Sequence, residues 1–260
     1  MLRQTVTSLL ESPTPKVDAS RWRALLLPHA GHSYSGAVCG IGVASVAWPK
    51  TILLLGPNHR GSGAPAALSD ATAWRTPLGN LPTSRRLVAA LAAEAPGLEL
   101  DAAAHAKEHA LEVILPFLQV VRPDAEIACV SIGQPDFSLC EEIGLAAATA
   151  IASLEGEGER VAIVVSSDLS HYLPKKENGK KDERAITAVL EGDPRELFER
   201  VLVRERISMC GILPATALLV ALKHLPACKP SLLAHRDSSD AGGDPSGVVG
   251  YAAIRWTESS

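Results

Sequence analysis

The chain has 260 residues, of which 47% are hydrophobic and 21% charged, and its formal net charge is −4. This composition is ordinary for a globular protein, and the length suits one large α/β domain without an internal repeat or linker. The acidic balance and an aromatic content of 4% exclude the basic, base-stacking surface typical of nucleic-acid binding. We therefore expect a single domain over residues 1–260, with residues 1–20 as a peripheral N-terminal segment and no nucleic-acid partner.

The cysteines and the hydropathy pattern indicate the cellular compartment. Five cysteines without Cys-x-x-Cys spacing favour a reducing environment over a disulfide framework. No apolar stretch approaches the roughly 18 residues of a membrane span. The N-terminus also lacks the charged and then apolar pattern of a signal peptide. We expect a soluble, cytoplasmic protein with no membrane contact.

Short apolar runs alternate with helical patterns along the chain. The first half is predicted to contain a short helix before Ser12, a strand ending at Leu27, a helix over Ser35–Ala47, a strand over Thr51–Leu55, an extra strand over Ala66–Trp74 and a helix over Thr83–Ala95 with Thr83 as N-cap. The second half is predicted to contain a helix over Glu108–Val121 that Pro116 kinks or restarts, a strand over Ile127–Ile132, a helix over Ser138–Leu154, a strand over Val161–Val165, helices over Arg184–Val201 and Pro214–His224, and strands over Ser231–His235 and Val248–Ile254. This alternation predicts a three-layer α/β/α domain with a mostly parallel central sheet.

Three of the buried strands end at groups that can bind a metal. His29 lies in Pro-His-Ala-Gly, His59 ends Gly-Pro-Asn-His, and Asp168 and His171 follow the strand over Val161–Val165. In open α/β sheets the ligand site lies beyond the carboxyl ends of the strands. One strand–helix unit separates the two histidines, so we expect their loops to be neighbours and their imidazoles to meet one metal.

Other polar residues carry weaker signals. Asp168 can orient the ring of His171 or share a proton with it, although a helix N-cap beside an incidental histidine gives the same pattern. His32 is expected at the rim of the cleft. A lone Cys210 is compatible with a ligand or with a small buried hydrophobe.

The segment that opens the predicted helix over Glu108–Val121 is rich in titratable residues. Glu108 and Glu112 lie four residues apart, as do His105 and His109. At helical spacing each pair shares one face. A metal-binding face is therefore conceivable, but charges on a solvated helix surface explain the same pattern.

Taken together, these segments resemble the Memo family, named in bacteria and archaea as AmmeMemoRadiSam system protein B. The matching motifs, in the family's order, are Pro28-His29-Ala30-Gly31, Gly56-Pro57-Asn58-His59, Trp74-Arg75-Thr76-Pro77-Leu78-Gly79, Glu108-His109-Ala110-Leu111-Glu112 with Leu115-Pro116, Ser166-Ser167-Asp168-Leu169-Ser170-His171-Tyr172, Cys210-Gly211 and Val249-Gly250-Tyr251-Ala252. The chain departs from many relatives in two places: its first 20 residues lack an Ala-Gly segment followed by aromatic residues, and His32 stands where an aromatic residue is common.

The resemblance implies a fold similar to that of class III extradiol ring-cleaving dioxygenases, which hold Fe(II) with two histidines and a carboxylate. Carried over by position, His29 and His59 would be the two histidine ligands, and Cys210 stands in place of the carboxylate. His171 matches the acid/base histidine, with Asp168 beside it. His109 would line the same cleft.

The leading hypothesis is a cytoplasmic mononuclear metal protein with a redox or O2-dependent role on an unknown small substrate. The cofactor would be Fe(II), with Cu or Zn also compatible with two imidazoles and a thiolate. If the protein is an enzyme, it would be a metal-dependent oxidoreductase in which His171, oriented by Asp168, moves protons. The family name also implies an association with a radical-SAM protein.

Two other hypotheses stay open. The first is a non-catalytic binding module whose dioxygenase-like cleft holds a peptide or a small anion. The second is a metal-independent hydrolase that uses Asp168, His171 and Cys210 as the nucleophile. The hydrolase needs Cys210 within hydrogen-bond reach of His171 and a depressed thiol pKa.

Overall fold

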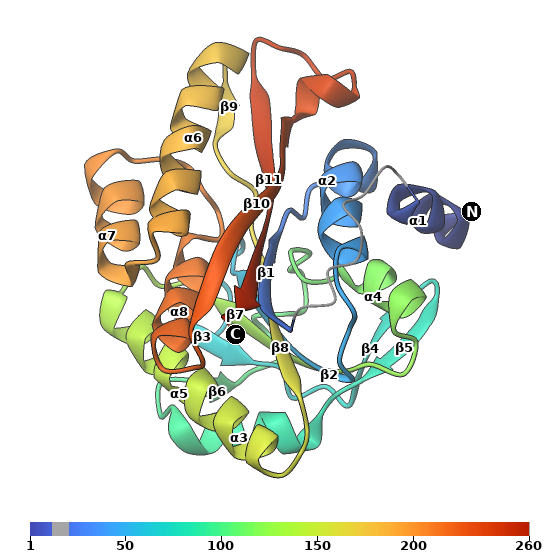
Figure 1. Ribbon diagram of the computed structural model, residues 1–260, viewed down its shortest axis with the longest axis vertical. Helices are drawn as coiled ribbons and strands as arrows, with labels where there is room; N and C mark the ends of the chain where they lie inside the picture. Colours follow the sequence, from blue (N-terminus) through green and yellow to red (C-terminus); the bar gives the residue numbers. More distant parts are fainter. Residues whose placement is uncertain (12–20, 260) are drawn as a thin grey trace.

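Four parallel strands form the centre of the sheet in the computed structural model, which describes residues 1–11 and 21–259 (Figure 1). Their order across the sheet is β1 (Trp22–Leu27), β8 (Val161–Ser166), β2 (Thr51–Pro57) and β7 (Glu126–Ile132). Every residue of β1, β2 and β8 is buried. Continuous burial is expected for parallel strands covered on both faces, and it explains their unbroken runs of Leu, Ile and Val.

The edges of the sheet are mainly antiparallel. On one side β11 (Val248–Glu258) pairs antiparallel with β1, and β10 (Cys228–Asp237) and the short β9 (His171–Leu173) both pair antiparallel with β11. On the other side β3 (Ala66–Leu68) is antiparallel to β7, and β6 (Glu99–Leu100) is parallel to β3. β4 (Ala73–Thr76) and β5 (Gly79–Pro82) form a separate hairpin. The mostly parallel sheet is therefore confirmed for its centre.

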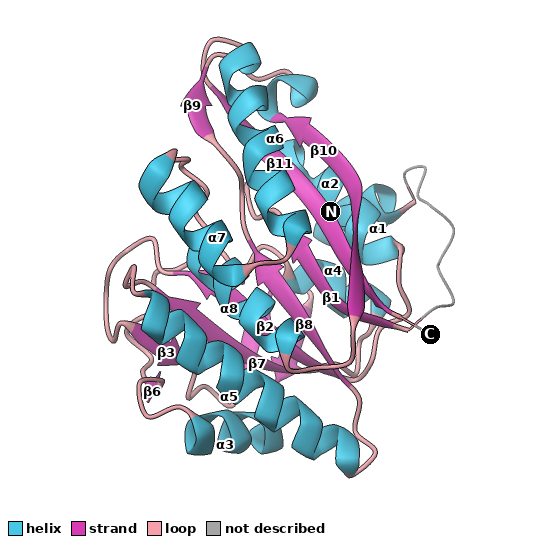
Figure 2. Cartoon of the chain, turned by 60° about the vertical axis from the view of Figure 1, so that its left-hand side comes forward, coloured by secondary structure: helices cyan, strands magenta, loops and turns pink. Residues whose placement is uncertain are grey.

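Helices cover both faces of the sheet (Figures 1 and 2). One face packs against α1 (Leu2–Leu10), α2 (His32–Ala44) and α4 (Leu115–Val121). The other packs against α3 (Arg85–Glu94), α5 (Phe137–Gly156), α6 (Lys175–Glu191), α7 (Pro194–Phe198) and α8 (Ile212–Lys223). A π-helical turn, η1 (Glu199–Arg204), follows α7, and a 3-10 turn, η2 (Ser238–Ala241), joins β10 to β11. The predicted three-layer α/β/α domain is confirmed.

Close packing explains the glycines of α2. A Cβ atom on Gly40 would lie 2.3 Å from the backbone oxygen of Leu9, so the α1–α2 contact requires glycine there. Val6 of α1 is fully buried in this contact. The helix before Ser12 is thus present and contributes to the core, whereas residues 12–20 of the expected peripheral segment lie outside the described part of the chain.

One helix in the described residues is long and apolar enough to cross a membrane by length and composition. This helix is α5, so the expectation that no apolar stretch approaches the length of a membrane span was wrong. Half of its most apolar window is buried inside the protein. Cys140, Ile143 and Ile151 of this helix pack into the core with α3 and α8. These contacts are those of a core helix.

Two predicted elements in the first half of the chain were wrong in detail. Ala66–Trp74 is not one strand, because β3 joins the main sheet and β4 begins a separate hairpin. The N-cap of α3 is Ser84 rather than Thr83, and its hydroxyl accepts a hydrogen bond from the backbone N–H of Leu87 at 3.4 Å.

The predicted helix over Glu108–Val121 was also wrong in its first half. Residues 110–114 form turns, and the helix begins at Leu115 with Pro116 in its first turn, where the missing N–H costs no hydrogen bond. In this segment Glu108 accepts hydrogen bonds from the backbone N–H groups of His109 and Ala110. The proposed helical faces of Glu108 with Glu112 and of His105 with His109 therefore do not exist.

The predicted helix over Arg184–Val201 spans three elements instead. α6 ends at Gly192, whose φ of 76° lies in the left-handed region that favours glycine at a helix C-terminus. The Asp193 side chain then caps α7 by accepting a hydrogen bond from the N–H of Glu196, and η1 completes the segment.

Candidate metal centre

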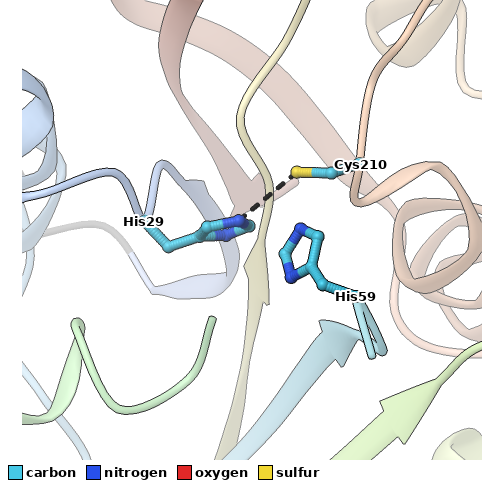
Figure 3. A group of neighbouring side chains, drawn as sticks. All are labelled: His29, His59 and Cys210. Carbon is cyan, nitrogen blue, oxygen red and sulfur yellow. Dashed lines mark hydrogen bonds between the residues drawn. The ribbon is translucent and has the colours of Figure 1, made fainter. Parts of the chain in front are cut away.

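His29, His59 and Cys210 meet at the carboxyl ends of the central strands (Figure 3). One nitrogen of each imidazole and the cysteine sulfur all lie within 4.8 Å of one another. The two rings contact edge to face, with centroids 5.2 Å apart. The prediction that the His29 and His59 loops converge is confirmed, but the reason given for it was wrong. β8 lies between β1 and β2, so the loops approach each other across the end of β8.

His29 is buried in the turn that follows β1. Its Nδ1 lies 2.7 Å from the hydroxyl of Ser166, the last residue of β8, and its Nε2 lies 3.3 Å from Cys210 Sγ. Burial, together with the charges of His59 and His109, lowers the pKa of His29 to about 3. The imidazole is therefore neutral at physiological pH, as a metal ligand must be.

His59 follows β2 and is held by a buried carboxylate. Glu108 accepts hydrogen bonds from the backbone N–H of His59 at 2.6 Å and from its Nδ1 at 2.9 Å. Burial acts to raise the pKa of Glu108, but the hydrogen bonds from His109, His59 and backbone amides outweigh it and hold the pKa far below its ordinary value. A charged carboxylate on Nδ1 leaves Nε2 of His59 as the nitrogen available to a metal ion, the usual arrangement in carboxylate–histidine–metal sites.

Cys210 lies in the turn just before α8. Its Sγ accepts a hydrogen bond from the backbone N–H of Asp168 at 3.2 Å. The next residue must be glycine, because a Cβ on Gly211 would lie 2.3 Å from the Cβ of Ser167. Burial, reinforced by the charge of Asp168, raises the pKa of the Cys210 thiol well above its ordinary value.

Asp168 has a different role from the one predicted. Its Oδ1 accepts hydrogen bonds from the backbone N–H of His29 at 2.8 Å and of Ala30 at 3.3 Å. Burial raises the pKa of this carboxyl, against the lowering effect of the hydrogen bond from His29 and the charge of His171. Asp168 thus ties the turn that carries His29 to the loop that contacts Cys210.

His171 lies beside the centre but is not oriented by Asp168. Its Nδ1 lies 2.8 Å from the backbone oxygen of Ser208, and its backbone N–H donates to the Ser208 hydroxyl. Because a carbonyl only accepts hydrogen bonds, Nδ1 carries the proton and Nε2 is free to accept one. Ser208 therefore supplies the orientation that was predicted for Asp168.

His109 and His32, two other histidines named in the sequence analysis, differ in position. His109 stacks on His59 with ring centroids 5.1 Å apart and is half exposed, and its hydrogen bond to Glu108 raises its pKa. It therefore lines the cluster, as predicted. His32 faces away from it, with Nε2 on the backbone oxygen of Val113 and its ring against Phe117.

A pocket of about 510 Å³ adjoins the cluster. Glu108 and His109 form the wall that it shares with the candidate ligands, and Trp74 and His105 contact each other edge to face in its lining, with ring centroids 5.5 Å apart. This volume is within the range of small-molecule sites, which combine apolar walls with a few polar groups.

The structure also identifies site residues that the sequence did not reveal. Glu108 was interpreted as a surface charge, yet it is the carboxylate that holds His59. Ser166 and Ser208 support His29 and His171. The sequence signals were the presence of Glu108 and Ser166 in the matching motifs and the position of Ser166 at the end of a strand whose loop carries Asp168.

The donor set fits a transition-metal ion. Two neutral imidazoles and one sulfur are the ligands that iron, copper and zinc accept, whereas calcium and magnesium require oxygen. The hydrolase hypothesis is not supported, because Cys210 contacts His29 rather than His171 in the described residues and its thiol pKa is raised.

Comparisons with known proteins agree with the motif pattern. The family described as Memo-like protein matches residues 1–255. A "MEMO1 family protein" of Methanococcoides burtonii is 38% identical over 230 residues, covering 88% of this chain and 84% of the relative. A protein of the same name from Thermotoga neapolitana is 37% identical over 230 residues, covering 87% and 80% of the two chains.

A solved structure shares the fold. The crystal structure of an uncharacterized protein, JW3007 of Escherichia coli K12, aligns with a TM-score of 0.58, covering 90% of this chain and 99% of that chain. At 17% identity this likeness concerns the fold alone. The family match over residues 1–255 and the identity to the two relatives show that the chain belongs to the Memo family.

Proposed function

We propose that the protein binds one transition-metal ion through His29, His59 and Cys210 and uses it in redox or O2-dependent chemistry on a small substrate. The observation that carries the proposal is the convergence of three donor atoms within 4.8 Å from three separate loops. The proposed ion is Fe(II), with Cu or Zn as alternatives that the same donors accept. When bound, it would supply electron transfer and open coordination positions.

The protein's own residues would prepare the reaction. The pocket beside His109 would hold the substrate next to the metal ligands. His171 would accept a proton at Nε2, since its Nδ1 proton is committed to the Ser208 carbonyl. Asp168 would hold the His29 turn in place by accepting a hydrogen bond from the backbone N–H of His29. A cytoplasmic location and a radical-SAM partner remain predictions.

Metal content, measured by ICP-MS on protein purified anaerobically, tests the metal site. We expect near-stoichiometric iron or copper in the wild type and loss of the metal in a His59→Ala/Cys210→Ala double variant. His224→Ala removes an exposed histidine at the end of α8 and should retain the metal. Absence of metal from the wild type, even after Fe(II) is supplied, would favour a binding module for a peptide or a small anion.

The redox role is tested separately by O2 consumption. Metal-loaded wild type would be screened with small aromatic substrates, catechols included, beside the double variant. Metal-dependent O2 uptake that His171→Ala reduces would support the proposed proton transfer. A fully loaded centre that consumes no O2 and does not change oxidation state would refute the redox role while leaving the metal site intact.

A further inference from the structure

Ser166 occupies a position where one hydroxyl group contacts two polar atoms at short distance. Its Oγ lies 2.6 Å from the backbone oxygen of Ala110 and 2.7 Å from Nδ1 of His29. The residue is fully buried. Each of these contacts needs one hydrogen atom between its two heavy atoms, and the hydroxyl carries only one.

The direction of both hydrogen bonds follows from the chemistry of the partners. The Ala110 carbonyl cannot donate, so the hydroxyl hydrogen of Ser166 must point to it. The hydroxyl then offers only lone pairs to His29, so the hydrogen in that contact must belong to Nδ1. The neutral imidazole of His29 is therefore the Nδ1–H tautomer, and its Nε2 lone pair faces Cys210 and His59.

We propose that Ser166 is a positioning residue that selects the tautomer of His29 and so decides which nitrogen is offered to the metal. This inference rests on the proposed metal site and adds to it the reason that the site is prepared before the metal arrives. The same device acts on His59, where the carboxylate of Glu108 accepts the Nδ1 proton.

Both supports converge on one turn of the chain. The backbone N–H of Ala110 donates to Glu108 Oε1 at 2.9 Å, and its carbonyl accepts from Ser166. The segment 108–110 thus fixes His59 directly through Glu108 and fixes His29 indirectly through Ser166. Although β8 separates the two strands that carry these histidines, their supports are linked through a single residue, Ala110.

Two substitutions of Ser166 and one matched control test this assignment. Ser166→Ala removes the acceptor of the His29 proton, and Ser166→Thr retains a hydroxyl. Ser131 offers the control, because it is also buried near the end of a central strand, β7, and donates to a backbone carbonyl, that of Pro57. Ser131→Ala should therefore cause a comparable loss of packing and hydrogen bonding while leaving the hydrogen bonds of the His29 ring in place.

The decisive readout is the 15N chemical shifts of the His29 ring, measured by long-range 1H–15N correlation on metal-free protein. We expect the Nδ1–H tautomer in the wild type, Ser131→Ala and Ser166→Thr, and a mixture or the opposite tautomer in Ser166→Ala. The dissociation constant for Fe(II), from competition with a chelator, should rise about 10- to 100-fold in Ser166→Ala only.

The outcomes separate this inference from the proposed function. An unchanged His29 tautomer in Ser166→Ala would overturn the assignment, whether or not the affinity falls, because a weaker affinity alone would then reflect packing. If the wild type binds none of Fe(II), Cu or Zn, the proposed function fails, yet the tautomer shift in metal-free protein still decides the role of Ser166. Should Ser166→Thr unfold, the comparison of Ser166→Ala with Ser131→Ala retains the test.

Discussion

Both ends of the central sheet bury titratable side chains, but the side chains at the two ends have different kinds of partner. At the amino end, the fully buried Arg23 donates to Glu155 at 2.8 and 3.0 Å, to Glu258 at 2.5 Å and to the carbonyl of Val161. At the carboxyl end, one donor atom each of His29, His59 and Cys210 lies within 4.8 Å of the others. The amino end supplies its own counter-charges, whereas the carboxyl end would, in the proposed function, receive its charge from a bound cation.

This difference separates stability from function. A closed ion cluster needs nothing from outside, and removing one member leaves an uncompensated charge in the interior. A cluster of neutral donors has no internal cation to hold, so its residues are arranged by hydrogen bonds on their far sides instead. Substitutions at the amino end should therefore change stability, and substitutions at the carboxyl end should change metal binding.

The largest expected effect is on stability and lies at the amino end. Arg23→Ala removes the buried cation that pairs with Glu155 and Glu258 and leaves both carboxylates in a partly buried site. The free energy of unfolding should therefore fall by about 3–5 kcal/mol. Urea denaturation would measure the loss. Metal content should be unchanged in the folded fraction, and loss of metal from well-folded Arg23→Ala would contradict the separation of the two ends.

The corresponding change at the carboxyl end should affect metal binding. Glu108→Gln removes the charged acceptor of the His59 Nδ1 proton, so the Fe(II) dissociation constant should rise about 10- to 100-fold. Glu112→Gln is the control, because this exposed acid lies four residues further along the same segment. Equal effects of the two variants would show that net charge near the pocket, rather than the orientation of His59, sets the affinity.

Acid should weaken the amino end through Glu155. Burial acts to raise the pKa of Glu155, but the hydrogen bond and charge of Arg23 outweigh it and lower the pKa below its ordinary value. A lowered folded-state pKa contributes stability that is present above the unfolded-state pKa, about 4.5, and is lost as the pH falls below it. Glu155→Gln should therefore be less stable than the wild type at pH 7, and the two should converge on acidification. Parallel stability curves would contradict this.

The smallest effect is expected for an exposed ion pair near the same end. Arg86 pairs with Glu157 and with Glu159, but more than half of its side chain is accessible to solvent. Arg86→Ala should change the free energy of unfolding by less than about 1 kcal/mol. A loss as large as that of Arg23→Ala would mean that burial is not what distinguishes the Arg23 cluster.

Much of the fold could be predicted because buried parallel strands have a local signature. The runs ending at Leu27, Leu55, Ile132 and Val165 all became strands of the sheet centre. The order of those strands could not be predicted from spacing, because β8 is inserted between β1 and β2 by pairings more than 100 residues apart in the sequence. Local sequence also did not reveal the turn before α4, in which the Glu108 carboxylate accepts hydrogen bonds from the N–H groups of His109 and Ala110.

The candidate site was predictable to the extent that its residues lie in motifs. His29 and His59 follow strands, and the resemblance to the Memo family supplied Cys210, which spacing alone left ambiguous. Ser208 lies in none of the motifs and Ser166 lies in one, but no local pattern assigns either a role, because a serine becomes a positioning residue only through the partner that the tertiary structure brings to it. The role predicted for Asp168 was wrong for the same reason, because its carboxylate accepts hydrogen bonds from the backbone of residues 29 and 30.

The position of β8 between β1 and β2 also has a consequence for synthesis of the chain. While only the first half has emerged from the ribosome, the strands carrying His29 and His59 lack the one that separates them, and Cys210 has not been made. Non-local strand pairing of this kind closes late in folding. Capture of the proposed metal ion should therefore follow completion of the sheet, so that the finished domain, rather than a nascent fragment, would acquire it.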